Sequence, residues 1–192
     1  SVSGLSDGGF VICWMSVNQD GDGGGIYAQR YDAQGHVIGS EFRINTTTNG
    51  WQEVPCITSL TDGGFVISWS STDPDKGWKI YAQRYDEQGN SQGIEFSVSN
   101  NTLYSNQPNI IALSDGGFVV SWVSFNQDSG RSIFAQCYDA QGNEKGAEFE
   151  VNASTNWVEA PCLTALVNGG FVASWYSWNQ DGDQGGIYGR IY

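Results

Sequence analysis

Short runs of apolar residues recur along the whole chain, each bounded by glycine, aspartate or asparagine. In the first run, alternation places Phe10, Ile12 and Trp14 on one side of an extended chain and Val11 and Cys13 on the other. Both sides are largely apolar, so we expect both faces of this strand to be covered. The helical period of 3.6 residues is not visible in the sequence. The pattern therefore predicts an all-β protein made of short strands.

These runs belong to a tandem repeat. The segment LSDGGFVICW recurs as LTDGGFVISW, LSDGGFVVSW and LVNGGFVASW, and its first residue is Leu5, Leu60, Leu113 and Leu166 in turn. The copies are therefore spaced by 55, 53 and 53 residues. Further segments follow in a fixed order, represented in the first copies by GIYAQRYDAQG, EFRI and PCITSL. Each segment is typical of one strand, so a full copy supplies four strands.

The repeat predicts the fold class. The copies span approximately 1–54, 55–107, 108–160 and 161–192, and together they form one repeat-built domain. Four short strands in about 50 residues are typical of a β-propeller blade. We therefore expect an all-β, four-bladed β-propeller of four-stranded antiparallel blades. One blade is incomplete, because the EF segment is missing from the last copy.

The incomplete blade leaves two arrangements open. The ring closes with one three-stranded blade, which is the arrangement we favour, or an exposed edge pairs with a second chain in a homo-oligomer. In either case we expect the tryptophan that ends each repeated segment to pack between blades rather than to bind a ligand. These residues are Trp14, Trp69, Trp122 and Trp175.

Glycine and aspartate mark the turns. Tight hairpins that need a positive φ are predicted where Asp-Gly-Gly or Asn-Gly-Gly stands, at 7–9, 62–64, 115–117 and 168–170. Type I turns that begin with aspartate and end with glycine are predicted at 32–35, 86–89 and 139–142. Most aspartates of the chain are explained by this turn chemistry.

The repeated segments resemble the tandem repeats of large bacterial surface proteins, including RTX-type and cadherin-like adhesins. The shared pattern is GGFVVxW, then IYAQRFD, then EFxVNT, and it covers essentially the whole chain. The resemblance implies an extracellular, adhesion-associated module, secreted or at the cell surface, and it supplies no catalytic residues. The last copy departs from the pattern with Arg190 and Ile191, and the third copy with Cys137.

Composition narrows the function classes. Eight basic and 21 acidic residues give a net charge of −13, which argues against nucleic acid or an anionic membrane as a partner. No apolar run reaches the roughly 20 residues that cross a bilayer, so we expect no membrane insertion. Residues 1–4 resemble no secretory leader, so we expect a mature or excised fragment. The single histidine, His36, and the repetition of the acidic residues argue against an enzyme.

Acidic loops follow the repeated tryptophan segments and are candidate Ca²⁺ sites. Alternating Asp or Asn with Gly resembles the front of a calcium loop, although the closing Glu of an EF-hand is missing. A solvated hairpin tip needs the same residues. The candidate ligands are Asn18, Asp20, Asp22, Asp73, Asp75, Asp128, Asn179, Asp181 and Asp183.

An aromatic residue precedes each inter-copy proline by four positions, and polar residues follow it. An exposed ring stacks on the apolar face of a sugar, while an amide or carboxylate bonds its hydroxyl groups. The alternative is that the rings pack onto the neighbouring blade. The candidate glycan-binding residues are Trp51, Glu53, Tyr104, Asn106, Trp157 and Glu159.

Four cysteines allow three disulfide pairings, and the sequence does not choose among them. They are Cys13, Cys56, Cys137 and Cys162; buried free thiols are the alternative. Asn45, Asn100 and Asn152 fit the N-glycosylation pattern, which matters only in a eukaryotic source.

The function that we favour from sequence is a non-enzymatic, multivalent, lectin-like module. One alternative is a calcium-stabilised structural or protein-interaction module of an adhesin, whose partner is a surface protein. A second alternative is a propeller that binds a small molecule or pigment.

Overall fold

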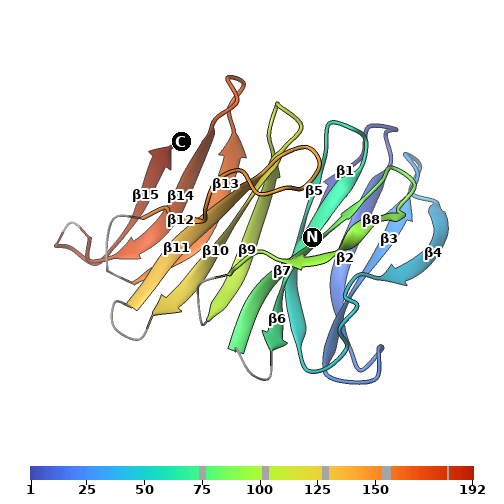
Figure 1. The fold of residues 1–192 in the computed structure, drawn as a ribbon, viewed down its shortest axis with the longest axis horizontal. Helices are drawn as coiled ribbons and strands as arrows, with labels where there is room; N and C mark the ends of the chain where they lie inside the picture. The colour runs from blue at the N-terminus through green and yellow to red at the C-terminus, as the bar shows by residue number, and fades with distance from the viewer. Residues whose placement is uncertain (74–76, 101–103, 127–129, 153–156, 181) are drawn as a thin grey trace.

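In the computed structural model, residues 1–73, 77–100, 104–126, 130–152, 157–180 and 182–192 are described. Within these ranges the secondary structure consists of fifteen strands, and there is no helix (Figure 1). Four antiparallel sheets contain them, numbered 1 to 4 in chain order. Sheet 1 has β1 (Val2–Gly4), β2 (Phe10–Val17), β3 (Gly24–Tyr31) and β4 (Val37–Arg43). Sheet 2 has β5 (Gln52–Ser59), β6 (Phe65–Asp73), β7 (Gly77–Tyr85) and β8 (Ser91–Ser97). Sheet 3 has β9 (Ser105–Ala112), β10 (Phe118–Asn126), β11 (Gly130–Tyr138) and β12 (Phe149–Glu150). Sheet 4 has β13 (Val158–Ala165), β14 (Phe171–Trp178) and β15 (Gly185–Ile191).

Each repeat copy supplies one sheet, as the sequence predicts. Sheets 1 to 3 have four strands and sheet 4 has three, and the strands of every sheet are neighbours in chain order. Within sheet 4, β15 pairs with β14 alone among the described strands.

The hairpins show why the turn residues recur. Gly117 donates its N–H to Asp115 Oδ1 at 3.0 Å, and Gly116 has a φ of 87°. A Cβ on Gly117 would lie 2.3 Å from the carbonyl oxygen of Tyr138, so only glycine fits there. In the next turn, the side chain and the N–H of Asn143 both donate to Asp139, and these bonds hold the pKa of Asp139 below its ordinary value. The predicted turns are confirmed at both places.

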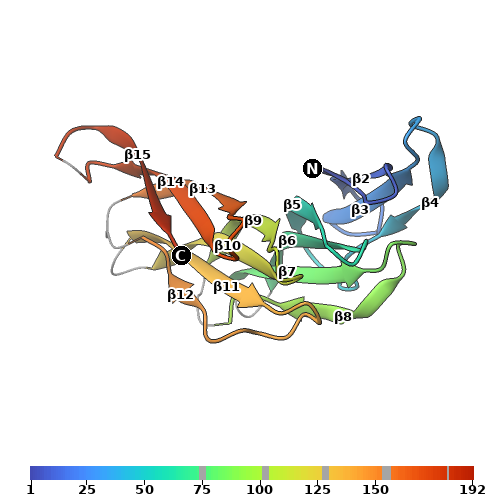
Figure 2. The same cartoon turned by 90° about the horizontal axis from the view of Figure 1, so that it is seen from above.

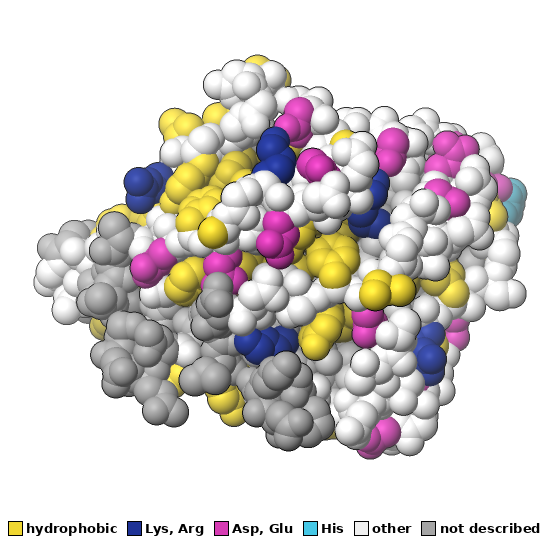
Figure 3. Space-filling view, in the orientation of Figure 1, with side chains coloured by type: hydrophobic (Ala, Val, Ile, Leu, Met, Phe, Trp, Pro, Cys, Tyr) yellow, Lys and Arg dark blue, Asp and Glu magenta, His cyan; other side chains and the backbone are white. Residues whose placement is uncertain are grey.

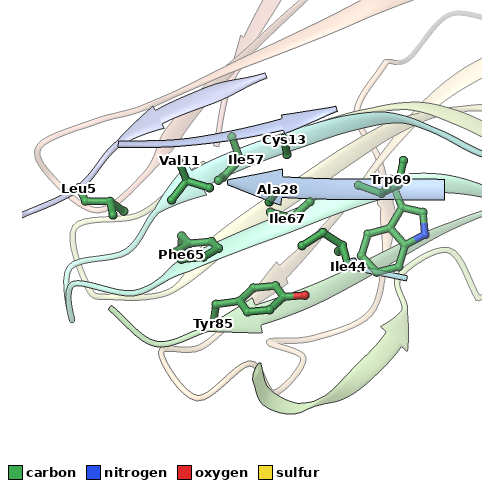
Figure 4. Packing of buried hydrophobic residues seen from close by; sticks show 11 residues of the cluster. Leu5, Val11, Cys13, Ala28, Ile44, Ile57, Phe65, Ile67, Trp69 and Tyr85 are labelled. Carbon is green, nitrogen blue, oxygen red and sulfur yellow. The ribbon is translucent and has the colours of Figure 1, made fainter. Parts of the chain in front are cut away.

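The core lies between the sheets. We call the face of each sheet that points to the following sheet its leading face, and the opposite face its trailing face. The leading face of sheet 1 packs on the trailing face of sheet 2, with Val11, Cys13 and Ile44 against Phe65 and Trp69 (Figure 4). The same arrangement joins sheet 2 to sheet 3 and sheet 3 to sheet 4. Each interface therefore repeats one packing scheme.

The repeated tryptophans pack between sheets, as predicted. Trp69, Trp122 and Trp175 are buried within the three interfaces, on the trailing faces of sheets 2, 3 and 4. Trp14 holds the same position in sheet 1 but is only partly buried. In the described part of the chain, no other sheet packs on the trailing face of sheet 1, although Tyr27 and Gln29 on that face are buried.

The four sheets form an open arc. Figure 2 shows sheet 1 and sheet 4 at its two ends, with sheets 2 and 3 between them. The inner strands β1, β5, β9 and β13 pack in that order along the inside of the arc. The closed ring that we favoured from sequence is therefore not the arrangement seen: four copies build four blades, but sheet 4 does not return to sheet 1.

A bulge interrupts three inner strands at the residue before proline. Val54, Gln107 and Ala160 have φ values of 52°, 53° and 51°, and the pairing register shifts at each of them. A positive φ is rare for residues with a side chain, and the residue before proline normally adopts an extended conformation. Three copies thus share one strained feature, close to the predicted aromatic positions.

The cysteines are all free thiols in this structure. Cys13 is buried and Cys162 is exposed, and the other two lie between these extremes. Burial raises the pKa of the Cys13 thiol to about 11. The structure therefore contains free thiols rather than disulfides, and of the four only Cys13 is buried as that alternative supposed.

Candidate functional site

A hollow lies on sheet 4, next to a predicted aromatic residue. It has a volume of about 740 Å³ and is lined by Trp157, Glu159, Ala160, Tyr176 and Trp178. Glu159 on β13 is paired with Tyr176 on β14, so both side chains belong to the same face. Trp157 and Trp178 are each about half exposed, at 48% and 50%. Two indole rings therefore border an open hollow with a carboxylate beside them.

Polar contacts fix the Trp157 ring. Its Nε1 donates a hydrogen bond to Glu159 Oε1. The same carboxylate oxygen pairs with Arg131 Nη1 at 3.1 Å, and the Arg131 guanidinium carbon lies 3.7 Å from the centre of the Trp157 ring. A guanidinium over an indole face contributes roughly 0.5–1 kcal/mol at an exposed site. Because Arg131 is on sheet 3, this site joins two consecutive copies.

The three predicted aromatic residues have matching geometry. Trp51, Tyr104 and Trp157 are 44%, 53% and 48% exposed. The backbone carbonyl of each accepts a 2.8 Å hydrogen bond from the last part of the following strand, at Thr72, Phe125 and Trp178 respectively. The rings are thus half exposed, while Trp51 also bridges to Gly24 of sheet 1 and Trp157 contacts Arg131 of sheet 3, so contact with the neighbouring blade is present as well.

The predicted polar neighbours also share one position in the pairing. Glu53, Asn106 and Glu159 are paired with Ser70, Val123 and Tyr176 in the adjoining strands. Glu53 and Glu159 are partly buried, whereas Asn106 is exposed. Glu159 is the one that lines the described hollow.

A smaller hollow lies between sheets 1 and 2. It has a volume of about 160 Å³ and is lined by Asn45, Thr47, Trp69, Ser71, Thr72, Tyr81 and Glu95. Glu95 accepts a 2.7 Å bond from the N–H of Thr46, and Thr72 Oγ1 accepts one of the same length from the N–H of Trp51. Trp51 is thus tied to the rim of a hollow that has both polar and aromatic lining residues.

Sequence reasoning missed several of these lining residues. Arg131 and Tyr176 reach the Trp157 site only through folding, since one lies in the preceding copy and the other on a neighbouring strand. Trp178 could have been predicted from the sequence, because another aromatic residue, Phe125, occupies the equivalent position in the third copy. Thr72, a polar residue, occupies the equivalent position in the second copy and lines the smaller hollow.

The acidic loops are described in part. Asp20 Oδ2 accepts a bond from Asn45 Nδ2 at 3.2 Å, and Asp22 Oδ2 accepts one from the N–H of Gly50 at 3.0 Å. Asn18 and Asn179 both adopt a positive φ at the start of their loops, and Asp183 is exposed. Asp75, Asp128 and Asp181 lie outside the described residues, as does the side chain of Asp73.

These loops do not gather carboxylates in the part of the chain that is described. Across those ranges, no group of three or more His, Cys, Asp or Glu side chains is placed to hold a metal ion. Oδ1 of Asp20 is buried without a hydrogen-bond partner among the described residues. Calcium binding stays a prediction, with this one oxygen as the observation that bears on it.

Two of the three candidate glycosylation residues have a structural role. Asn45 and Asn152 are 2% and 1% exposed, and their side-chain oxygens accept bonds from the N–H groups of Ile26 and Ile133. A glycan would be attached to the side-chain nitrogen, and side chains this deeply buried leave no room for it. The pattern at both positions is therefore explained by packing.

No family model matches the chain, and no curated protein matches it. Solved structures do resemble it. A protein of unknown function from Dyadobacter fermentans superposes with a TM-score of 0.70 at 14% identity, over 99% of this chain and 64% of that one. An α-L-arabinanase from Penicillium chrysogenum, complexed with arabinobiose, gives 0.66 at 18% identity, over 100% and 62%. The Hadza microbial sialidase Hz136 gives 0.68 at 12% identity, over 99% and 43%.

The fold is a β-propeller. This propeller chain spans less than two thirds of the length of each of the three proteins named above. Because the sequence identities are low, the similarity concerns the fold alone. In the described part of the propeller, no helix is long and apolar enough to cross a membrane.

Proposed function

We propose that this propeller is a non-enzymatic, multivalent carbohydrate-binding module that works outside the cell or on its surface. The observation that carries the proposal is the hollow beside Trp157, where two half-exposed indoles and a carboxylate border one open space. Sugars present apolar C–H faces and hydroxyl groups together, and this lining offers a partner to each. An α-L-arabinanase with arabinobiose bound has the same fold, so the fold accommodates a saccharide in that protein.

The chemistry of the Trp157 site follows from its contacts. Arg131 lies over the indole at 3.7 Å and restrains it, so little side-chain entropy remains to be lost when a ligand stacks on the ring. Glu159 shares one oxygen with both Arg131 and Trp157. Its second oxygen is the acceptor that we assign to a sugar hydroxyl.

Repetition supports a multivalent role. Trp51, Tyr104 and Trp157 stand at equivalent positions and keep similar exposure. Weak sites on one rigid body engage a surface glycan array together, which raises avidity by about 10²–10⁴ over a single site.

The test is a glycan array and a set of alanine variants. Wild type is compared with Trp157→Ala, with the triple variant at Trp51, Tyr104 and Trp157, and with Ile94→Ala as a control at another exposed apolar side chain. We expect Trp157→Ala to weaken binding about tenfold and the triple variant to lose the avidity gain. Binding that is unchanged in a folded triple variant would remove these rings from the site.

The same preparation tests the absence of catalysis. We expect no reducing sugar to be released from the glycans that bind. Release that persists in wild type and disappears in Glu159→Gln would make the protein a glycosidase and overturn the non-enzymatic part of the proposal.

A second candidate is a calcium-stabilised structural or interaction module of an adhesin. The buried, unpartnered Oδ1 of Asp20 favours it, since a cation would supply the missing partner. Thermal unfolding of the wild type and of Asp20→Asn, each in Ca²⁺ and then in EDTA, tests this candidate. A melting temperature that does not respond to Ca²⁺ would end this candidate, whereas glycan binding in EDTA would leave the first proposal intact.

A further inference from the structure

The leading face of sheet 4 is bare although it repeats faces that are buried elsewhere. Ile187 is 76% exposed, whereas Ile26, Ile80 and Ile133 at the same position are fully buried. Ile191, on the same strand, is also mostly exposed. Figure 3 shows hydrophobic side chains gathered over the part of the surface where sheet 4 lies. An uncovered face of this composition is typical of an interaction site.

The trailing face of sheet 1 also lacks a neighbouring sheet among the described residues and is exposed in part, with Phe10, Ile12 and Trp14 half-buried. Val2 is 63% exposed, whereas Ile57 at the same position of sheet 2 is buried. Phe10 and Tyr31 stack at 4.9 Å, just as Phe65 and Tyr85 do at 5.0 Å in the interface between sheets 1 and 2. Sheet 1 thus presents a preformed copy of a surface that already packs against a leading face within this chain.

Contacts between the turns of neighbouring sheets follow the same pattern as the packing of their faces. Ser6 of sheet 1 lies 3.2 Å from the Cβ position of Gly63 in sheet 2, and Thr61 of sheet 2 is at the same distance from that of Gly116 in sheet 3. The residue that continues this series is Val167, which is fully exposed. The glycine that would receive it is Gly8, whose Cβ position has no contact with another sheet.

Two of the three interfaces also share a bond between a backbone N–H and a side-chain hydroxyl, whereas Ile111 stands at the hydroxyl position in the third. Ser3 Oγ accepts a bond from the N–H of Ser59, and Thr58 Oγ1 accepts one from the N–H of Ala112, at 3.0 and 3.2 Å. Thr164 holds the next position of this series on sheet 4 and is exposed. Its counterpart would be the N–H of Gly4.

We propose that the leading face of sheet 4 binds the trailing face of sheet 1 of a second copy, so that the chains associate head to tail. The occupant is a second copy because this chain itself carries the surface that three internal interfaces show to fit. The contact is heterologous, with different surfaces on the two partners, so it extends from chain to chain or closes a ring of chains. This inference is independent of glycan binding.

Association covers the Tyr176 side of the Trp157 hollow and leaves its two indole rings accessible. On sheet 3, whose leading face is covered by sheet 4, Tyr104 and Phe125 remain 53% and 45% exposed while Val123 is buried. Trp157 and Trp178 are their equivalents on sheet 4, so they stay exposed in the assembly. Tyr176 takes the place of Val123 and is covered.

Sedimentation over a wide range of protein concentration tests the proposal with the 192-residue chain. We expect the wild-type mass to rise with concentration, and Ile187→Asp and Val2→Asp to remain monomers when each is alone. Both side chains are exposed, so the variants keep their fold, which circular dichroism verifies. Ile94→Asp, on the outer strand β8, is the matched control and associates like wild type.

Mixing the two monomeric variants separates this geometry from others. Ile187→Asp keeps an intact sheet 1 face and Val2→Asp keeps an intact sheet 4 face, so the mixture forms a dimer and nothing larger. A symmetric interface between two sheet 4 faces or two sheet 1 faces would let one of the two variants associate by itself and would overturn the proposal. A wild type that stays monomeric at every concentration, through closure of its own ring or because another protein covers the faces, overturns it as well. Glycan binding measured on monomeric Val2→Asp, whose substitution lies on β1 and away from the Trp157 hollow, reports on the sites of a single chain.

Discussion

In three copies, one buried polar side chain accepts a hydrogen bond from a backbone N–H of the third strand of its sheet. Asn45 and Asn152 accept a bond from the N–H of Ile26 and Ile133, and Ser99 does the same for Ile80 at 3.0 Å. A buried N–H that loses its acceptor costs about 1–3 kcal/mol. The three positions therefore need an oxygen at one place in space and do not need one particular amino acid.

Substitution of Asn152 tests this role. We expect Asn152→Ala to lower the free energy of unfolding by about 1–3 kcal/mol, and Asn152→Ser to lower it less, because serine already serves this purpose in sheet 2. Urea denaturation measures both. Equal losses in the two variants would contradict the role of the side-chain oxygen.

Thiol reactivity differs among the cysteines for a physical reason. Burial raises the pKa of Cys13 to about 11, so little thiolate exists near neutral pH, whereas Cys162 is exposed. With a limiting amount of iodoacetamide under native conditions, we expect Cys162 to be alkylated first and Cys13 last. Peptide mass spectrometry reads the order, and unfolding in urea should abolish the difference. Early labelling of Cys13 would show that its strand opens readily.

At the scale of elements, glycine sets the hairpins. We expect Gly117→Ala to destabilise the protein by several kcal/mol, because the new Cβ would lie 2.3 Å from a backbone oxygen that cannot move without disturbing β11. Gly4→Ala is the control, since a Cβ there meets nothing within 4 Å. Thermal unfolding compares the two. A Gly117→Ala protein as stable as the control would mean that the turn relaxes easily.

The elements were predictable and the hollow was not. Each strand and turn follows from residues that lie next to one another in the sequence, such as Asp115 with Gly117. The aromatic positions followed as well, because they repeat. The Trp157 hollow depends on pairing register, which brings Tyr176 beside Glu159, and on packing between sheets, which brings Arg131 over the ring. Neither of these two contacts is determined by residues that lie close together in the sequence.

The whole molecule behaves as a row of units that contact only their neighbours. Stability should therefore be greatest in the middle, where sheets 2 and 3 are covered on both faces, and least at the ends. We expect amide protons of β15 to exchange with deuterium faster than those of the equivalent strands β7 and β11. Hydrogen-exchange mass spectrometry measures this at a concentration where the chain is monomeric. Uniform protection of all three strands would contradict the row of units.

The open arc of sheets could not be predicted from the sequence, for a related reason. Every copy carries the same two faces, so the pattern shows that sheets stack but not how far each turns relative to the last. Closure after four sheets and continuation to a further sheet satisfy the same local contacts. The exposure of Ile187 and Val2 distinguishes them, and exposure is a property of the assembled molecule.

The repetition of one packing scheme has a consequence for how such a chain changes over generations. Because each interface is made from one leading and one trailing face, a duplication of one 53-residue unit within the gene inserts a sheet whose two faces fit its new neighbours at once. A deletion of one unit joins the faces on either side of it just as well. Unequal recombination therefore alters the length of the row while leaving every surviving interface chemically unchanged.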